Sequence, residues 1–248
     1  MLVDEIFDYA TGFDDCLKTA DIRIGLGYCA VLLEDGRCGL AYTLHEKEYE
    51  SCAVVPDAGS LSGRSVSELM GWIKSPDSIA CAVGLATINA LIDLPHGTVE
   101  SDVLDMLPVR TGDAVGMIGY FGPLVGPLKE SVREMYIFER KADPDYGILP
   151  ESASTELLPG CQVVIITATS LLNGTMDGLL DLVGKAREIA ILGPSTPFVP
   201  EVFGQHGVTM LSGLQVQDAG KILQIVSEGG GTRQFGSAAR KLSLRLSN

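Results

Sequence analysis

Three segments of the sequence combine glycine or proline with hydroxyl, amide or aromatic side chains, and each directly follows a short apolar run. They are Gly119–Pro123, Thr167–Thr175 and Gly193–Pro197. Glycine lets a backbone turn tightly and lets a ligand approach the amides at a following helix start. Hydroxyl and amide side chains in such turns can hold polar groups of a ligand, so these segments are the first candidates for a binding site.

The first segment has part of a dinucleotide-binding pattern. Glu139 lies 20 residues after Gly119, near the place where a dinucleotide fold puts the acid that binds the ribose. The full G-x-G-x-x-G pattern is absent, and Tyr120 and Phe121 occupy the turn. Three interpretations stay open: a nucleotide cofactor held by Gly119 and Glu139, another ligand in the same place, or glycines that serve only the turn.

The second segment concentrates five hydroxyl or amide side chains at the predicted end of a strand: Thr167, Thr169, Ser170, Asn173 and Thr175. Asn173 or Thr175 can cap the helix that follows. Capping explains one of these side chains but not the group. We therefore expect at least one of them to contact a ligand.

The third segment is Gly193-Pro194-Ser195-Thr196-Pro197. Its two prolines restrict the loop, and its two hydroxyls extend from a rigid backbone, which suits preorganised contacts. The alternative is a helix entry with a Ser/Thr cap. Asp218 follows the next predicted strand, and it either caps the next helix or faces the same crevice.

Asn89 is the polar residue that stands out in the N-terminal part, because it lies within a nearly all-apolar predicted helix. A buried amide needs hydrogen-bond partners. It is either a satisfied core residue or a residue that faces the second half across a cleft. Thr43 and His45, at the end of a predicted hairpin, are candidates for lining the same cleft.

Short apolar strands alternate with helices after Pro108, which predicts a parallel sheet covered on both faces. Ligands on such sheets bind outside the carboxyl ends of the strands. The predicted strands are Ala114–Ile118, Met135–Glu139, Val163–Thr167, Ile189–Leu192 and Val208–Leu211. The predicted helices are Val125–Val132, Pro150–Leu157, Thr175–Val183, Pro200–Gln205, Gln217–Glu228 and Ser237–Leu246.

The N-terminal part predicts a small α+β unit. Its elements are a helix within Met1–Lys18, strands at Asp21–Leu26, Tyr28–Glu34 and Arg37–Leu44, and helices from Ser65 to Ile73 and from Ser75 to Asp93. Asp35-Gly36 predicts a two-residue hairpin turn with Leu33 opposite Cys38. That register would put one set of residues on a single face: Cys29, Val31, Leu33, Cys38, Leu40 and Tyr42.

The composition limits the classes of partner. The formal net charge of −14 disfavours nucleic acid. The most apolar predicted helix is too short to span a bilayer, and the N-terminus lacks a signal-peptide pattern, so we expect a cytoplasmic protein with no membrane partner. The six cysteines lack C-x-x-C spacing, which favours buried, reduced thiols. The oligomeric state is open, with a homo-oligomer among the alternatives.

Five pieces of the sequence, in the right order, resemble one known family: GLAYTL, AVGLATINAL, GMIGYFGPL, ITATSLLNGTMDGLL and GPSTPFVPEVF. It is the putative heavy-metal chelation family, which joins an enolase N-terminal-like domain to a Rossmann-like domain. The resemblance covers most of the chain. It implies an α/β protein with domains at 1–107 and 108–248, and a site between them that binds metals or metal-tetrapyrrole compounds.

The leading hypothesis is therefore that a small molecule, a divalent transition metal or a metal complex binds in an interdomain cleft. The alternatives are a nucleotide-dependent enzyme and a non-enzymatic carrier or scaffold, and whether the protein is an enzyme stays open. No histidine–carboxylate cluster has ligand spacing, so ligands such as His45, His96, Glu139 and Asp218 would have to converge from distant positions. The residues expected to line the cleft are Asn89, Tyr120, Phe121, Glu139, Thr169, Asn173, Thr175, Gly193, Pro194, Ser195, Thr196 and Asp218.

Overall fold

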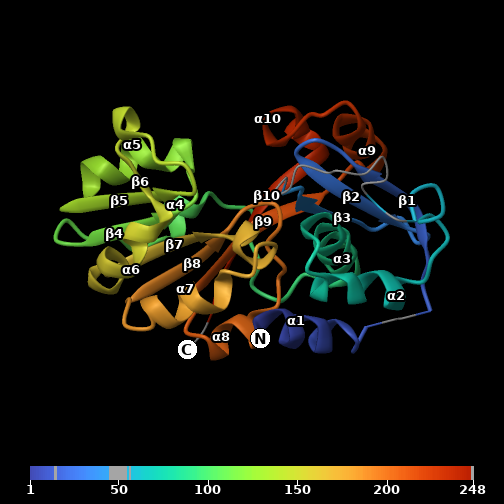
Figure 1. Ribbon diagram of the computed structural model, residues 1–248, viewed down its shortest axis with the longest axis horizontal. Coiled ribbons are helices and arrows are strands. Elements are labelled where there is room, and N and C mark those ends of the chain that lie inside the picture. The colour runs from blue at the N-terminus through green and yellow to red at the C-terminus, as the bar shows by residue number, and fades with distance from the viewer. Residues whose placement is uncertain (14–15, 45–54, 56, 247–248) are drawn as a thin grey trace.

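The computed structural model describes residues 1–246 except 14–15, 45–54 and 56. It contains a three-stranded antiparallel sheet and a seven-stranded, mostly parallel sheet, with helices around both (Figure 1). The chain therefore has the predicted mixed α/β fold.

The larger sheet has the strand order β10-β9-β8-β7-β4-β5-β6, and all its neighbours are parallel except β10 with β9. The chain enters at β4, adds β5 and β6 on one side, and then crosses to β7 on the other. The topological switch point therefore lies between β4 and β7. The strands are β4 (Ala114–Ile118), β5 (Glu134–Glu139), β6 (Ile148–Pro150), β7 (Val163–Thr167), β8 (Glu188–Leu192), β9 (Met210–Val216) and β10 (Ala239–Arg245).

Short helices and 3₁₀ turns connect these strands. The helices are α4 (Val103–Met106), α5 (Gly122–Ser131), α6 (Ser154–Leu157), α7 (Met176–Val183), α8 (Pro200–Gln205), α9 (Ala219–Ser227) and α10 (Thr232–Phe235). The 3₁₀ turns are η2 (Pro144–Tyr146), η3 (Glu151–Ala153), η4 (Leu158–Gly160), η5 (Ala168–Leu171) and η6 (Gly236–Ala238).

The N-terminal unit packs its sheet on one long apolar helix. The unit comprises α1 (Leu2–Ala10), β1 (Thr19–Ile24), β2 (Tyr28–Leu33), β3 (Cys38–Tyr42), α2 (Val66–Met70), η1 (Gly71–Lys74) and α3 (Ser78–Leu91). A Cβ on Gly39 of β3 would lie 2.1 Å from Ala86 O, so only glycine allows β3 to pack this closely on α3. The helix α3 is thereby fixed against the strand.

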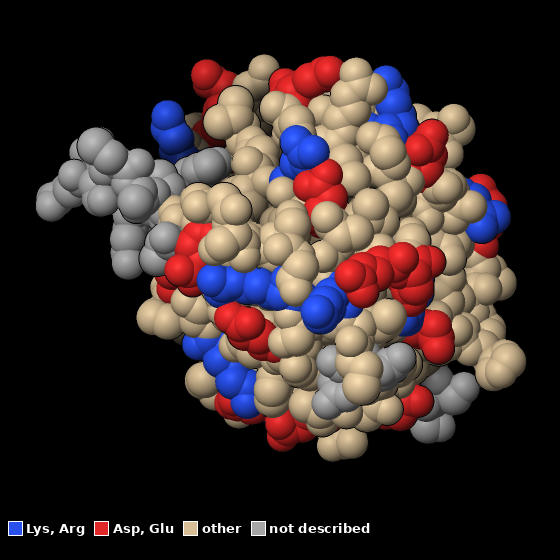
Figure 2. Space-filling view, turned by 90° about the vertical axis from the view of Figure 1, so that its right-hand side faces the viewer, with Lys and Arg blue, Asp and Glu red and all other residues tan. Residues whose placement is uncertain are grey.

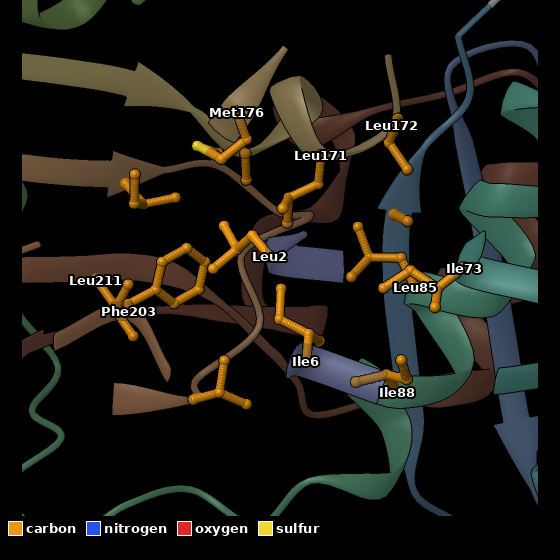
Figure 3. Packing of buried hydrophobic residues seen from close by; sticks show 14 of the residues in the cluster. Leu2, Ile6, Ile73, Leu85, Ile88, Leu171, Leu172, Met176, Phe203 and Leu211 are labelled. Carbon is orange, nitrogen blue, oxygen red and sulfur yellow. The ribbon is translucent and has the colours of Figure 1, made fainter. Parts of the chain in front are cut away.

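The two halves share their core. Leu2 and Ile6 of α1 are fully buried. Figure 3 shows them between Phe203 and Leu211 of the C-terminal half and Leu85 of α3. The helix α9 also crosses over: its apolar side packs on β2 and β3 in a separate cluster. The boundary at residues 107 and 108 stays a prediction, but helices from each half pack against the other.

The predicted hairpin register is wrong by one residue. Leu32 pairs with Cys38, and the Leu33 N–H donates to Arg37 O, so three residues form the loop and Gly36 has φ +93°. A glycine in the left-handed region gives a three-residue hairpin loop with a bulge. Consequently Cys38, Leu40 and Tyr42 lie on the face opposite to Cys29, Val31 and Leu33, and both faces are covered.

The predicted C-terminal helix Ser237–Leu246 is wrong as well, because this segment forms η6 and the strand β10. Leu242 and Leu244 alternate along β10, which pairs antiparallel with β9 from Ala239–Val216 to Arg245–Met210. The predicted helix Pro150–Leu157 is confirmed apart from its first residue: Pro150 ends the short strand β6, Glu151–Ala153 form η3 and Ser154–Leu157 form α6. Pairing with β9 therefore overrides the local helix preference of the segment that forms β10.

The surface carries charges of both signs. Figure 2 shows Lys and Arg side chains interspersed with Asp and Glu side chains on the face at the right of Figure 1. Among the described residues, none of the helices has the length and hydropathy needed to cross a membrane.

Candidate functional site

The switch point between β4 and β7 brings two of the predicted segments together. Gly119 directly follows β4 and has φ +89°, and a Cβ at this position would lie 3.0 Å from the Cβ of Thr167 at the end of β7. Both the backbone angle and the contact therefore require glycine. The turn after β4 and the hydroxyl-rich segment after β7 are neighbours, as the strand-end rule predicts.

The segment after β7 holds its own polar groups together. The hydroxyls of Thr167 and Thr169 are 3.0 Å apart. Asn173 Oδ1 accepts hydrogen bonds from Thr175 Oγ1 at 2.8 Å and from Thr175 N at 3.2 Å. Thr175 occupies the N-cap position of α7, but its side chain caps no amide. The segment is therefore a preorganised, half-buried group of hydroxyl and amide side chains.

Glu139 closes the turn after β4. Its Oε1 accepts a hydrogen bond of 2.7 Å from the Tyr120 N–H. A carboxylate therefore binds an amide that a phosphate would use in a dinucleotide site. Tyr120 is 45% exposed, whereas Phe121 is half-buried and packs near β4 and α5. The structure places Glu139 beside Gly119 as predicted, but gives its carboxylate an internal partner.

The loop after β8 binds the edge of the N-terminal sheet. Ser195 Oγ accepts a hydrogen bond of 2.8 Å from the Tyr42 N–H. Asn89 Nδ2 donates to Leu40 O at 2.9 Å and to Ser195 O at 3.3 Å. We call these four residues, Leu40, Tyr42, Asn89 and Ser195, the junction latch. Of the two alternatives left open for Asn89, the hydrogen bond to Ser195 O shows contact with the second half.

The junction latch follows from the topology of β3. This strand is at one end of the three-stranded sheet, so its outward carbonyl and amide groups lack a neighbouring strand. Buried backbone groups need partners. Asn89 supplies a donor to Leu40 O, and Ser195 supplies an acceptor to the Tyr42 N–H. Two side chains thus take the place of a neighbouring strand and join the halves.

Asp218 caps α9. Its Oδ1 accepts a hydrogen bond of 2.9 Å from the Lys221 N–H, and its side chain is exposed. Of the two alternatives left open by the sequence, the structure shows the cap. Gly193 and Pro194 directly precede Ser195 of the junction latch. The Thr196 N–H donates to Gly193 O at 3.0 Å, and this bond closes a tight turn.

Metal-ligating groups do not converge in the part of the chain that the structure describes. There, no three His, Cys, Asp or Glu side chains lie close enough to hold a metal ion. His206 Nε2 lies 2.8 Å from Glu5 Oε2, away from the strand ends. His45 lies outside the described residues. Of the ligands considered from the sequence, the three described ones, His96, Glu139 and Asp218, therefore do not form such a group.

The described cysteines other than the exposed Cys16 are poor thiolate ligands. Burial raises the pKa of Cys38 and of Cys81 to about 12, and that of Cys161 to about 11. Burial also raises the pKa of Cys29, which is fully buried. A thiol binds metals as the thiolate, so these four residues behave as small apolar core residues.

Two contacts were missed from the sequence. The backbone of Tyr42 is part of the junction latch. Asp177, which ends the NGTMD segment, accepts a hydrogen bond of 2.8 Å at Oδ1 from the Leu2 N–H. This bond ties the hydroxyl-rich segment to the start of α1. An aspartate in the first turn of a predicted helix indicates that it binds free backbone amides near a helix start. The sequence does not indicate which amide, because Leu2 lies 175 residues away from Asp177.

Two family models match the sequence, and both are described as putative heavy-metal chelation. One covers residues 8–92 and the other residues 102–245. The chain belongs to this family. The resemblance drawn from the sequence motifs is thus confirmed.

Relatives match over almost the whole chain. An uncharacterized protein of Methanocaldococcus jannaschii is 27% identical over 99% of this chain and 98% of its own length. Two crystal structures of family members of unknown function are similar in fold. The one from Pyrococcus horikoshii has a TM-score of 0.85 at 29% identity and covers 99% of this chain and 100% of its own. The one from Desulfitobacterium hafniense has a TM-score of 0.82 at 27% identity and covers 98% of each chain.

Proposed function

We propose that this protein binds a small ligand, a metal or a metal-tetrapyrrole complex in a cleft between the N-terminal unit and the strand-end edge of the larger sheet. The role would be the heavy-metal chelation for which its family is described. The observation that carries the proposal is the close approach of the Gly119 backbone to Thr167 at the switch point, where a Cβ on residue 119 would lie 3.0 Å from the Thr167 Cβ. Ligands of open α/β sheets bind at this point.

The donor chemistry favours a metal that arrives within an organic complex. The described residues supply hydroxyl and amide groups at the strand ends, and they contain no set of three metal-ligating side chains. A chelating ring brings its own nitrogen ligands, so the protein needs only to hold the ring. The net charge of −14 favours cationic complexes over anionic ones.

Each candidate residue has a distinct part in this proposal. Tyr120 and Phe121 offer aromatic surface to a flat apolar ring, while Thr169, Asn173 and Thr175 offer polar contacts. The segment Gly193–Thr196 and Asn89 form the wall toward the N-terminal unit. Glu139 and Asp218 bind backbone amides, so either carboxylate would have to give up a hydrogen bond to reach a ligand.

Calorimetric titration tests the proposal with Ni²⁺, Co²⁺, Fe²⁺ and Zn²⁺ salts and with a cobalt tetrapyrrole. We expect the complex to bind more tightly than the bare ions. Thr169→Val removes a hydroxyl at the switch point and should weaken binding by roughly tenfold, the equivalent of about one hydrogen bond. The matched control is Thr111→Val, because Thr111 is exposed and precedes β4 at the opposite edge. Equal affinities for the two variants, or no binding of any probe, would contradict the proposal.

The nucleotide alternative has less support, because the Tyr120 amide already binds Glu139. Titration with NAD, NADP, ATP and S-adenosylmethionine should give no heat and no thermal stabilisation. A carrier function stays compatible with the same site, since the proposal concerns binding and requires no chemical step.

A further inference from the structure

Two buried oxygens, one on a residue of the junction latch and one on the residue after Ser195, lack hydrogen-bond partners among the described residues. They are Asn89 Oδ1 and Thr196 Oγ1. Thr196 is 3% exposed and follows Ser195 directly, and Asn89 donates its amide hydrogens to Leu40 O and Ser195 O. A buried acceptor without a partner costs free energy, so such atoms mark the place of a bound water, ion or ligand.

We propose that the junction latch and Thr196 form a site for a monovalent cation. The available atoms are neutral oxygens: the carbonyls of Leu40 and Ser195, Asn89 Oδ1, and the hydroxyls of Ser195 and Thr196. Asn89 Oδ1 can only accept, so the occupant must be a hydrogen-bond donor or a cation. This inference does not rest on the proposed function, because it concerns stability without the ligand.

The local electrostatic field favours a positive charge. Asn89 lies in the last turn of the 14-residue helix α3, where the helix dipole is negative. Arg37 also approaches this end and donates to Leu91 O, but its charge is balanced by Asp35 at 2.7 Å and Asp93 at 3.8 Å. The end of α3 can therefore accept a further cation.

The ligand type favours a monovalent over a divalent ion. Calcium and magnesium sites use carboxylates to offset the cost of dehydration. The junction latch and Thr196 contain no carboxylate. Amide, hydroxyl and carbonyl oxygens are sufficient for K⁺, Na⁺ or NH₄⁺, which lose their hydration more easily.

Thr43 provides a matched control. Its hydroxyl is also buried and lacks a partner among the described residues. Thr43 follows Tyr42 of the junction latch directly, and Ser78 at the start of α3 donates to the next residue at Leu44 O. Thr43 is therefore a neighbouring buried hydroxyl that is not among the proposed ligands.

The test is thermal unfolding in K⁺, Na⁺, NH₄⁺ or tetramethylammonium chloride at constant ionic strength, with no other ligand. We expect at least one small cation to raise Tm saturably, by roughly 5–10 °C at a hundred times its Kd. Thr196→Val should abolish the cation-dependent rise, whereas Thr196→Ser and Thr43→Val should keep it. Calorimetric titration of wild-type protein with the same ion should give a Kd that matches the Tm curve.

Equal Tm values for the wild-type protein in all four salts would overturn this inference and would indicate that water satisfies the two oxygens. An unchanged cation effect in Thr196→Val would overturn it too. If Thr196→Val does not fold, loss of the effect in Thr43→Val or in Thr196→Ser would also count against the site. None of these results bears on metal-complex binding at the switch point.

Discussion

Replacing Ser195 with alanine isolates one bond of the junction latch. The substitution removes the acceptor of the Tyr42 N–H, which lies 2.8 Å from Ser195 Oγ in a partly buried position. A buried amide that loses its partner costs about 1–3 kcal/mol, and partial burial puts this case at about 1–2 kcal/mol. In a protein of this size, each kcal/mol lowers Tm by roughly 2–4 °C. We therefore expect Tm to fall by roughly 2–8 °C.

Urea unfolding followed by circular dichroism measures this change. The midpoint should shift while the slope m stays constant, since the substitution leaves the surface exposed on unfolding unchanged. The control is Ser62→Ala at an exposed loop position, which should change the free energy of unfolding by less than about 0.5 kcal/mol. If Ser195→Ala were no more destabilising than Ser62→Ala, the bond to Tyr42 would not help to hold the halves together.

Three further substitutions or reactions test the fold. Gly39→Ala should lower the free energy of unfolding by about 1–3 kcal/mol, because the new Cβ would clash with α3. In the control Gly27→Ala the new Cβ would have no atom within 4 Å, so this variant should be nearly neutral. Equal thermal unfolding of the two variants would contradict this prediction. Hydrogen bonds from Arg187 lower the pKa of Asp113, so their stabilising effect is present above about pH 4 and is lost as the pH falls through the folded-state pKa. The variant Asp113→Asn should therefore lose less stability below pH 4 than the wild-type protein. Equal losses in the two proteins would refute this assignment. A thiol reagent at pH 8 should label four cysteines only after denaturation: Cys29, Cys38, Cys81 and Cys161. Labelling of the native protein at these positions, detected by mass spectrometry, would show that they are accessible and would contradict the prediction.

The parallel sheet could be predicted because its strands are short, apolar and buried on both faces. The strands β4 and β7 have the predicted bounds, and β5 and β8 each begin one residue earlier than predicted. The strand β10 could not be predicted in this way. Its residues Ala239–Arg245 are compatible with a helix, and only the seven-residue pairing with β9 selects the extended form.

The hairpin shows how a small error in a turn changes a larger assignment. Asp35-Gly36 correctly marks the loop, but the loop holds three residues and not two. A shift of one residue on one strand moves its side chains to the other face. The mistake had no visible signal in the sequence, because α3 covers one face of β3 and α9 the other, and both faces are therefore apolar.

Long-range contacts near the strand ends were predicted best where glycine or an isolated polar residue carried the signal. Gly119 and Asn89 occupy positions that the topology requires, and the structure gives each a long-range partner. The partners themselves could not be predicted. The Tyr42 backbone is available to Ser195 because β3 is an edge strand, and that property depends on the whole sheet.

The hydrogen bonds within the site narrow the chemistry of any ligand. The side-chain oxygens of Glu139, Asp218 and Asn173 already accept hydrogen bonds from amides or hydroxyls of the same chain. Glu139 and Asp218 therefore position a turn and a helix start, and a ligand that needs a free carboxylate would have to displace a hydrogen bond of about 1.5–3 kcal/mol. A ligand held by hydroxyls, glycine turns and aromatic surface avoids that cost. Under the proposed function, such contacts would suit a complex whose metal already has its ligands, and the protein would orient that complex through hydrogen bonds and packing.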